Sequence, residues 1–197
     1  MSKSDPASSQ KERSKTIRWV TTIFCVTIVI SAVISLISDQ IMSRSGILTA
    51  FLILMGIILI GIVFDIIGVA VTSADETPFH SMASRKVPGA QDAIRLLRNA
   101  SKVGSICNDV IGDVCGVVSG SASATIAALV ISNVNLGWPR GITLAMSALV
   151  AGLTVGGKAI GKGFAMKSAT SVVYSVGRIL YTLRNIPALF RKKKNKR

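Results

Sequence analysis

Residues 47–73 read ILTAFLILMGIILIGIVFDIIGVAVTS, and this run decides the fold. It carries no charge up to Phe64 and is then interrupted by one aspartate, Asp65. A bilayer core of about 30 Å needs about 20 mainly apolar residues in a helix, so the run predicts a transmembrane helix. A charge at that depth costs a few kcal/mol, which makes Asp65 a candidate functional residue.

Three further apolar runs predict transmembrane helices at 19–38, 103–131 and 141–157. A signal peptide is the alternative for the first run because basic residues precede it, but the run is long and has no clean small-residue cleavage site. Half of the 197 residues are hydrophobic, and too little polar sequence remains for a second folded domain. We therefore expect an all-α membrane protein with about four transmembrane helices in one domain, residues 16–190.

The segments outside the apolar runs are polar or basic. Residues 1–15 are rich in Ser and Lys and predict a disordered N-terminus. Residues 74–102 contain helix-breaking prolines and an amphipathic stretch, which predict a helical hairpin that forms a cytoplasmic belt at the membrane surface. Residues 164–190 predict a C-terminal interfacial helix, and the basic tail at 191–197 is expected to contact anionic lipid head groups.

The formal net charge of +14 arises from 23 Lys and Arg residues against 9 Asp and Glu residues. Along the chain, the basic residues flank the apolar runs in groups of five, one, five, one and eleven. Alternating high and low counts predict a multi-pass protein of the cell membrane with both termini in the cytoplasm. We expect membrane orientation, and not nucleic-acid binding, to explain the basic character.

The residue types offer little for catalysis or for a bound cofactor. Cys25, Cys107 and Cys115 all lie in apolar stretches and are typical of small buried hydrophobes. His80 is the only histidine, and it stands in a polar segment with no evident nucleophile or base beside it. We therefore expect neither an enzyme nor a cofactor protein.

Asp109, Asp113 and Lys158 join Asp65 as charged residues inside the apolar runs. Asp109 and Asp113 are spaced at i and i+4, so a helix places them on one face. Two carboxylates with nearby Ser or Asn oxygens suit a hard cation such as Mg²⁺. The alternative is a buried ion pair with Lys158, which implies no transport. The residue types alone leave both interpretations open.

Several short motifs resemble the transmembrane domain of the CNNM/CorC magnesium transporters. The segment "SADETP" at 73–78, followed by "SMASR" at 81–85, resembles the family's S-G-x-E-T-A…S-x-S-R segment. The segment "AQDAIRLLRN" at 90–99 resembles its belt helix. The segments "NDVIGD" at 108–113 and "GKAIGK" at 157–162 stand where the family has G-N-x-x-x-N and G-E-I-x-P-K, and the order of the parts is the same.

The resemblance implies a homodimeric divalent-cation transporter with Mg²⁺ as the transported ion, and it covers the transmembrane domain without nucleotide-sensing CBS domains. By position, the implied ion ligands are Ser73, Asp109, Asp113 and Gly157. Lys158 stands at the position of the family's glutamate. Further candidates in or beside the motifs are Asp65, Glu76 and Asn108. The alternative function is a non-transporting scaffold or regulatory subunit whose ion site is locked by a salt bridge between Lys158 and an aspartate.

Glycines recur at a spacing of four in the third run, as Gly112, Gly116 and Gly120, and in the fourth run, as Gly152 and Gly156. Small residues at this spacing let two helix backbones approach closely. The pattern fits packing within one subunit as well as the seam of a homodimer.

Overall fold

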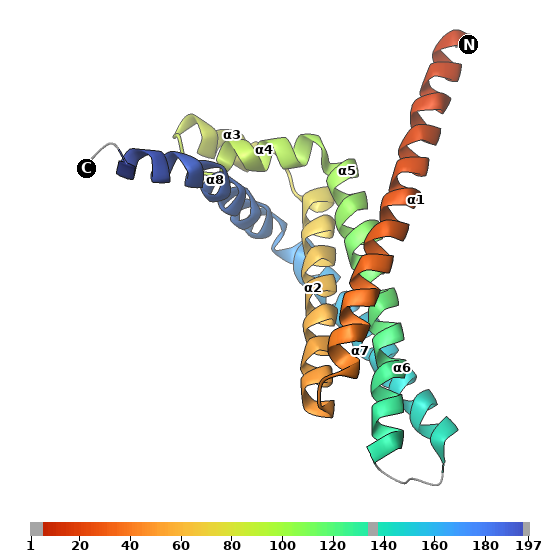
Figure 1. Ribbon diagram of the computed structural model, residues 1–197. Coiled ribbons are helices and arrows are strands. Elements are labelled where there is room, and N and C mark those ends of the chain that lie inside the picture. Colours follow the sequence, from red (N-terminus) through yellow and green to blue (C-terminus); the bar gives the residue numbers. More distant parts are fainter. Residues whose placement is uncertain (1–5, 134–137, 195–197) are drawn as a thin grey trace.

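The computed structural model describes residues 6–133 and 138–194. Within these residues every regular element is a helix, and four helical segments are long and apolar enough to cross a bilayer. Figure 1 shows the long helices side by side, with shorter helices laid across one end of the bundle. The chain is an all-α membrane protein with four such helices, as the apolar runs predicted.

The helices follow one another without intervening strands in the described residues. Their bounds are α1 Pro6–Ser43, α2 Ile47–Ser73, α3 Thr77–Ser84, α4 Ala90–Arg98, α5 Ala100–Ser105, the π-helix η1 Ile106–Gly112, α6 Asp113–Asn133, α7 Pro139–Lys167 and α8 Ala169–Lys194. Helices α5, η1 and α6 join into one membrane-crossing segment from Ala100 to Asn133.

The helix ends differ from the predicted ones wherever polar residues continue a helix. Helix α2 has the predicted bounds, but α1 begins at Pro6, so residues 6–15 are helical where disorder was expected. Proline suits a first helical position, and the Gln, Lys, Glu and Arg residues that follow are good helix formers. Residues 1–5 and 195–197 lie outside the described residues.

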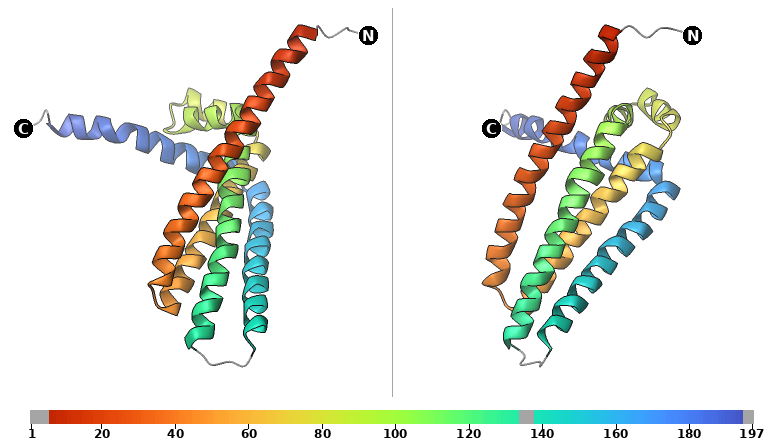
Figure 2. Two further views of the ribbon diagram at one scale, coloured as in Figure 1. Left: turned by 45° about the vertical axis from the view of Figure 1, so that its right-hand side comes forward. Right: turned by 90° about the vertical axis from the view of Figure 1, so that its right-hand side faces the viewer.

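Helix α7 also runs past its predicted end at Gly157, because the lysines that follow extend the helix as far as Lys167. The predicted interfacial helix accordingly begins at Ala169 as α8 and reaches Lys194, into the predicted basic tail. In Figure 2, α8 lies across the bundle, and the start of α1 and helices α3 and α4 are at the same end. The described ends of the chain, Pro6 and Lys194, therefore lie on the belt side.

Helix α2 is the centre of the bundle and contacts α1, α6, α7, η1 and α8. Two buried apolar clusters lie along it. The cluster near the belt includes Val71 of α2 and the fully buried Phe79 of α3. The cluster near the other end includes Leu54 of α2 and Ile126 of α6. The many exposed Leu, Ile, Val and Phe side chains on the outside of the bundle are suited to contact with lipid.

Glycines of α2 bring η1 and α6 close to it. A Cβ on Gly61 would lie only 2.8 Å from Cβ of Cys115, and a Cβ on Gly68 would overlap the amide of Asn108. A larger side chain at Gly61 would push against Cys115 next to its backbone, and one at Gly68 would displace the Asn108 amide. The contact therefore depends on the missing side chains.

Glycines of α7 allow a close contact with another side of α2. A Cβ on Gly157 would overlap Ile62, and one on Gly161 would lie 2.9 Å from Ile66. These two isoleucines thus fill the space that the glycines leave. Most of the glycines whose spacing predicted close packing do not serve it among the described residues: beyond the helix's own nearby backbone, no described atom lies within 4 Å of a Cβ built on Gly116, Gly120, Gly152 or Gly156.

We predict that Gly61→Leu lowers the stability of the fold, whereas Gly56→Leu on the same helix leaves it nearly unchanged. Leucine at 61 must displace Cys115, an overpacking that costs about 1–3 kcal/mol. Nothing lies within 4 Å of a Cβ at Gly56. Thermal unfolding of both variants in the same mild detergent measures the difference. Equal melting temperatures would contradict the close α2–α6 contact.

Candidate functional site

Charged and amide side chains from α2, η1, α6 and α7 gather inside the bundle, away from the belt. Asp65 lies two turns before the end of α2, or roughly 12 Å along the helix at 1.5 Å per residue. Asp113, the first residue of α6, lies roughly 20 Å along the joined helix from Ala100. The cluster is therefore at membrane depth and not at the surface.

Asp65 is the most deeply buried acid of the site. Its side chain faces η1 and α7, and the residue is only 3% exposed. No donor reaches its Oδ2 atom by a hydrogen bond, and the nearest ammonium, Nζ of Lys162, lies 4.0 Å from that atom. Lys162 is itself half exposed, so it compensates the buried carboxylate only in part.

Lys158 joins α7 to α6. Its Nζ atom donates a hydrogen bond to Oδ1 of Asp113 at 3.1 Å, and the lysine side chain is 18% exposed against 69% for the aspartate. A Cβ on Gly112 would lie 3.6 Å from this ammonium and 3.7 Å from Oδ1 of Asp65. The Lys158 ammonium and the Asp65 carboxylate therefore border the same glycine, at ordinary van der Waals distance from a side chain built there.

The segment that carries Asn108 and Asp109 is a π-helix, η1. Such segments occur mostly as single wide turns within α-helices and frequently at functional sites. The Asn108 side chain packs on Gly68 of α2, and its Oδ1 atom is buried without a hydrogen-bond partner. Asp109 is exposed, and within the described residues no hydrogen bond or ion pair reaches it.

The structure brings only some of the predicted site residues together. Asp65 and Asn108 share the seam between α2 and η1, and Lys158 and Asp113 stand beside Asp65. Ser73 is exposed at the end of α2, and Gly157 packs on Ile62, so neither has a described contact with this cluster. Among the side chains that the structure describes, no three His, Cys, Asp or Glu residues are placed to hold a metal ion.

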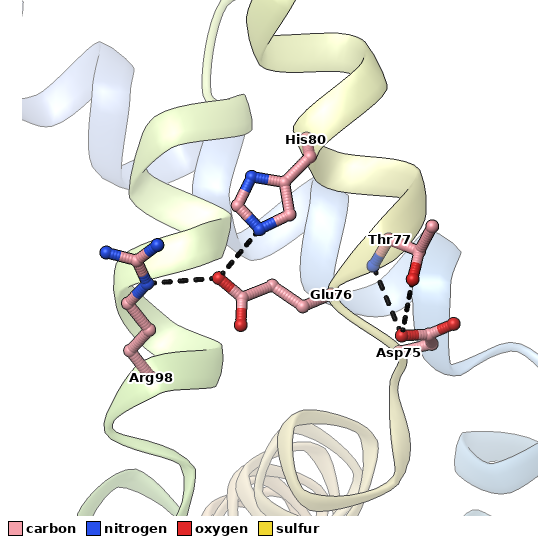
Figure 3. Close-up of polar contacts among 5 residues, drawn as sticks. All are labelled: Asp75, Glu76, Thr77, His80 and Arg98. Carbon is pink, nitrogen blue, oxygen red and sulfur yellow. Dashed lines mark hydrogen bonds and ion pairs between the residues drawn. The ribbon is translucent and has the colours of Figure 1, made fainter.

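Glu76, a candidate from its place in the first motif, lies in the belt. Its Oε1 atom accepts a hydrogen bond from Nε of Arg98 at 3.0 Å and lies 3.1 Å from Nε2 of His80 (Figure 3). These contacts hold α3 against α4 in the belt, outside the intramembrane cluster.

Asp75 fixes the start of α3. The backbone N–H and the hydroxyl of Thr77 both donate to its Oδ1 atom at 3.1 Å (Figure 3). These hydrogen bonds stabilise the carboxylate and lower the pKa of Asp75 below its usual value. The cap therefore stabilises the fold above the usual aspartate pKa, and this contribution is lost as the pH falls through the lowered pKa of the folded state.

The sequence-based interpretation missed Lys162 and Gly68, and it picked out Gly112 only for its spacing with Gly116 and Gly120. The signal for Lys162 was present, because Lys158 and Lys162 are spaced at i and i+4 and so share a face once α7 continues past Gly157. The roles of Gly68 and Gly112 depend on contacts between helices far apart in the sequence. A spacing pattern within one helix does not reveal them.

No protein-family model, curated protein or solved structure matches this chain. The resemblance to the CNNM/CorC transporters stays a prediction based on its motifs. The chemistry of the site therefore has to be argued from its own atoms: two buried oxygen acceptors without donors, two exposed aspartates, and two lysines on one face of α7.

We predict that Lys158→Met destabilises the protein and that adding Asp113→Asn partly restores stability. The substitution removes the donor to Asp113, and a hydrogen bond to a charged group contributes about 1.5–3 kcal/mol. The second change removes the carboxylate left without its partner. Thermal unfolding in detergent measures both effects. Lys102→Met, at an exposed lysine of α5, is the matched control, and a Lys158→Met protein as stable as this control would contradict the role of the ion pair.

Proposed function

We propose that this protein transports cations across the cell membrane, with divalent cations and above all Mg²⁺ as its substrates. The observation that carries the proposal is the pair of buried oxygens, Asp65 Oδ2 and Asn108 Oδ1, that no donor reaches. A carboxylate and an amide carbonyl are ligands that hard cations prefer. An unsatisfied buried acceptor costs about 1–3 kcal/mol, and a bound cation would offset that cost.

Asn108 Oδ1 lies at the contact between η1 and α2, and Asp65 has its Oδ1 atom beside Gly112 of η1 and its Oδ2 atom toward Lys162 of α7. Asn108 packs on Gly68, which is about one turn of α2 from Asp65. Asp113 follows directly after η1 and supplies a further oxygen when Lys158 releases it. A cation entering between α2 and η1 would thus meet ligands from helices that the glycine contacts already hold together.

Lys158 sets the condition for binding. The carboxylates of Asp65 and Asp113 are balanced by the ammonium groups of Lys158 and Lys162, so the cluster is neutral with both lysines charged. A divalent cation adds two positive charges to a region of low dielectric constant, where uncompensated charge is costly. Its entry would therefore displace the Lys158 ammonium or release its proton, which couples transport to protonation. Access would alternate between the two sides of the membrane around this site.

A second candidate function rests on the same ion pair. The 3.1 Å contact between Lys158 and Asp113 would lock the site if neither group ever moved or titrated. The protein would then be a non-transporting membrane scaffold or a regulatory subunit. This candidate differs from the transporter in one respect: no cation would compete with the lysine.

We propose in addition that the transporter is a homodimer joined through α6. The Asp113 side chain is 69% exposed at membrane depth, where contact of a charge with lipid is unfavourable. Gly116 and Gly120 follow it on the same helix, and within residues 6–133 and 138–194 no other part of the protein fills the space beside them. The α6 helix of a second copy could pack closely along these glycines, and it would then cover the Asp113 side chain.

The Lys and Arg pattern further supports an orientation with the belt and both termini in the cytoplasm. We predict that a reporter active only in the cytoplasm gives signal when fused to either end of the chain. A reporter active only outside the cytoplasm should stay silent at both ends. A signal from the second reporter at the C-terminus would contradict this orientation.

We predict Mg²⁺ flux by the wild-type protein in liposomes that contain a Mg²⁺-sensitive dye. Asp65→Asn and Asn108→Leu should each lower the flux at least about tenfold, since each removes a ligand oxygen and 1.4 kcal/mol corresponds to a tenfold effect. Asp75→Asn, which changes the acid that binds Thr77 at the start of α3 in the belt, is the control and should retain flux. The same proteins should show a Mg²⁺-dependent rise in melting temperature only where the site is intact.

The flux, thermal-stabilisation and rescue measurements together distinguish the two candidate functions. Absence of flux and of thermal stabilisation with Mg²⁺, Ca²⁺, Mn²⁺, Na⁺ and K⁺, together with rescue of Lys158→Met by Asp113→Asn, would reject the transporter and leave the scaffold.

We predict that Gly116→Leu weakens the homodimer without destabilising the monomer. A leucine there meets no atom of its own chain within 4 Å of its Cβ, but it would stand in the proposed seam. Gly56→Leu, equally open but on α2, is the control. Light scattering in nanodiscs and mild detergent gives the mass of each protein. A monomeric wild type in both media would contradict the dimer.

A further inference from the structure

A polar pocket of about 200 Å³ lies where the turn before α4 meets α8, far from the intramembrane cluster. Figure 1 shows this turn and α8 side by side at the belt end. The two backbones are in direct contact: a Cβ on Gly89 would lie 2.7 Å from the Arg178 backbone, and one on Gly177 would lie 2.7 Å from the Gly89 carbonyl. Gly89 also has φ of +88°, which favours glycine. The pocket wall is therefore built by the fold itself.

Asp92 forms the acidic part of this pocket. The residue is 7% exposed, and its Oδ1 atom accepts hydrogen bonds from Nη1 of Arg184 at 3.1 Å and from Nη1 of Arg95 at 3.3 Å. Its Oδ2 atom is buried and accepts none. A buried carboxylate oxygen without a donor is unfavourable, so a ligand that donates an N–H there would stabilise it.

Basic groups line the same pocket. Lys86 and Arg184 contribute to its wall, together with the ring of Tyr181. Arg184 uses one nitrogen on Asp92, and a guanidinium has further N–H donors to offer. One acidic oxygen lacks a donor, and the two cations beside it have N–H groups to offer to an acceptor. Together they suit a dipolar ligand with an ammonium group close to a phosphate.

The surroundings of the pocket favour a lipid as the source of that ligand. Helix α8 lies at the belt end of the bundle, and on either side of Tyr181 it exposes Ile179, Leu180 and Leu183. Apolar side chains of this kind on an interfacial helix contact acyl chains. We propose that the pocket binds the head group of phosphatidylethanolamine, with its ammonium on Asp92 and its phosphate on Lys86 and Arg184.

The geometry also predicts which head groups are refused. Phosphatidylcholine has the same phosphate, but its trimethylammonium has no N–H to donate to Asp92. Phosphatidylglycerol has the phosphate and no cation at all. The site would therefore select by the donors on nitrogen, which distinguishes it from a basic surface that attracts every anionic lipid.

The test uses the full chain in nanodiscs of equal parts phosphatidylethanolamine, phosphatidylcholine and phosphatidylglycerol. Native mass spectrometry of the released protein counts the retained lipids of each kind. We expect phosphatidylethanolamine to be retained about tenfold over phosphatidylcholine, the effect of one charge-assisted hydrogen bond. With the N-methyl and N,N-dimethyl lipids, retention should fall stepwise as N–H donors are removed. This series needs no variant and so holds even if Asp92 is required for folding.

Three variants identify the residues. Asp92→Asn should abolish the difference between phosphatidylethanolamine and phosphatidylcholine, with folding checked by melting temperature. Lys86→Asn should lower the retention of phosphatidylethanolamine severalfold, and asparagine tolerates the φ of 56° at this position. Lys102→Asn, an exposed lysine that does not line the pocket, is the matched control and should change nothing.

Three results would overturn the proposal. Equal retention of phosphatidylethanolamine and phosphatidylcholine by the wild type, or dominant retention of phosphatidylglycerol that Lys86→Asn and Lys102→Asn reduce alike, would leave only a general basic surface. Free phosphoethanolamine binding to the detergent-solubilised protein as tightly as a short-chain phosphatidylethanolamine would assign the pocket to a soluble compound and reject the lipid.

Discussion

The structure depends on how closely α2 and the joined α5–η1–α6 helix approach each other. In lipid, no hydrophobic force drives helices together, so contact has to come from backbone proximity and close packing. Gly61 and Gly68 supply that proximity from α2, and the neighbouring helix fills the space with Cys115 and Asn108. Because α7 packs on the same helix through Gly157 and Gly161, α2 is held on two sides at once.

This packing is what makes an aspartate tolerable in the middle of the bundle. Asp65 is removed from lipid by the same contacts that place Gly112 beside it, and the lysines of α7 reach it from the other side. The compensation is incomplete, since one carboxylate oxygen remains without a donor. A scaffold selected for stability alone would gain by replacing such a group with an apolar residue. Its presence is the strongest physical reason to connect the cluster with transport.

Features that depend on neighbouring residues in the sequence were predicted correctly more often than features that depend on contacts between distant residues. The bounds of α2 were predictable because an apolar run of that length, interrupted only by Asp65, is long enough to cross a bilayer as one helix. The end of α7 was predicted too early because the uncharged run ends at Gly157, whereas the helix continues through Lys158, whose side chain reaches Asp113. The extension of α1 was missed because a polar composition is compatible with a helix as well as with disorder.

For the candidate site, residue types identified the intramembrane charges but not their partners. The salt bridge of Lys158 with Asp113 was one of two readings that spacing left open, and only the arrangement of α6 and α7 joins the two residues. Ser73 and Glu76 were chosen from motif resemblance, and their surroundings in the fold are an exposed helix end and a belt contact. Glycines acting across helices and the wide turn at η1 have no signature in a single sequence.

That wide turn has a mechanical consequence. A π-helical turn holds one more residue than an α-helical turn. Because η1 lies within a membrane-crossing helix, it offsets the residues of α6 by one position relative to those of α5. If η1 closed into α-helical form with its belt end held in place, α6 would have to rotate by about 100° and shift about 1.5 Å along its axis. Asp113, at the first position after the turn, would swing away from Lys158. A change confined to a few backbone hydrogen bonds would thus rotate all of α6 about its axis.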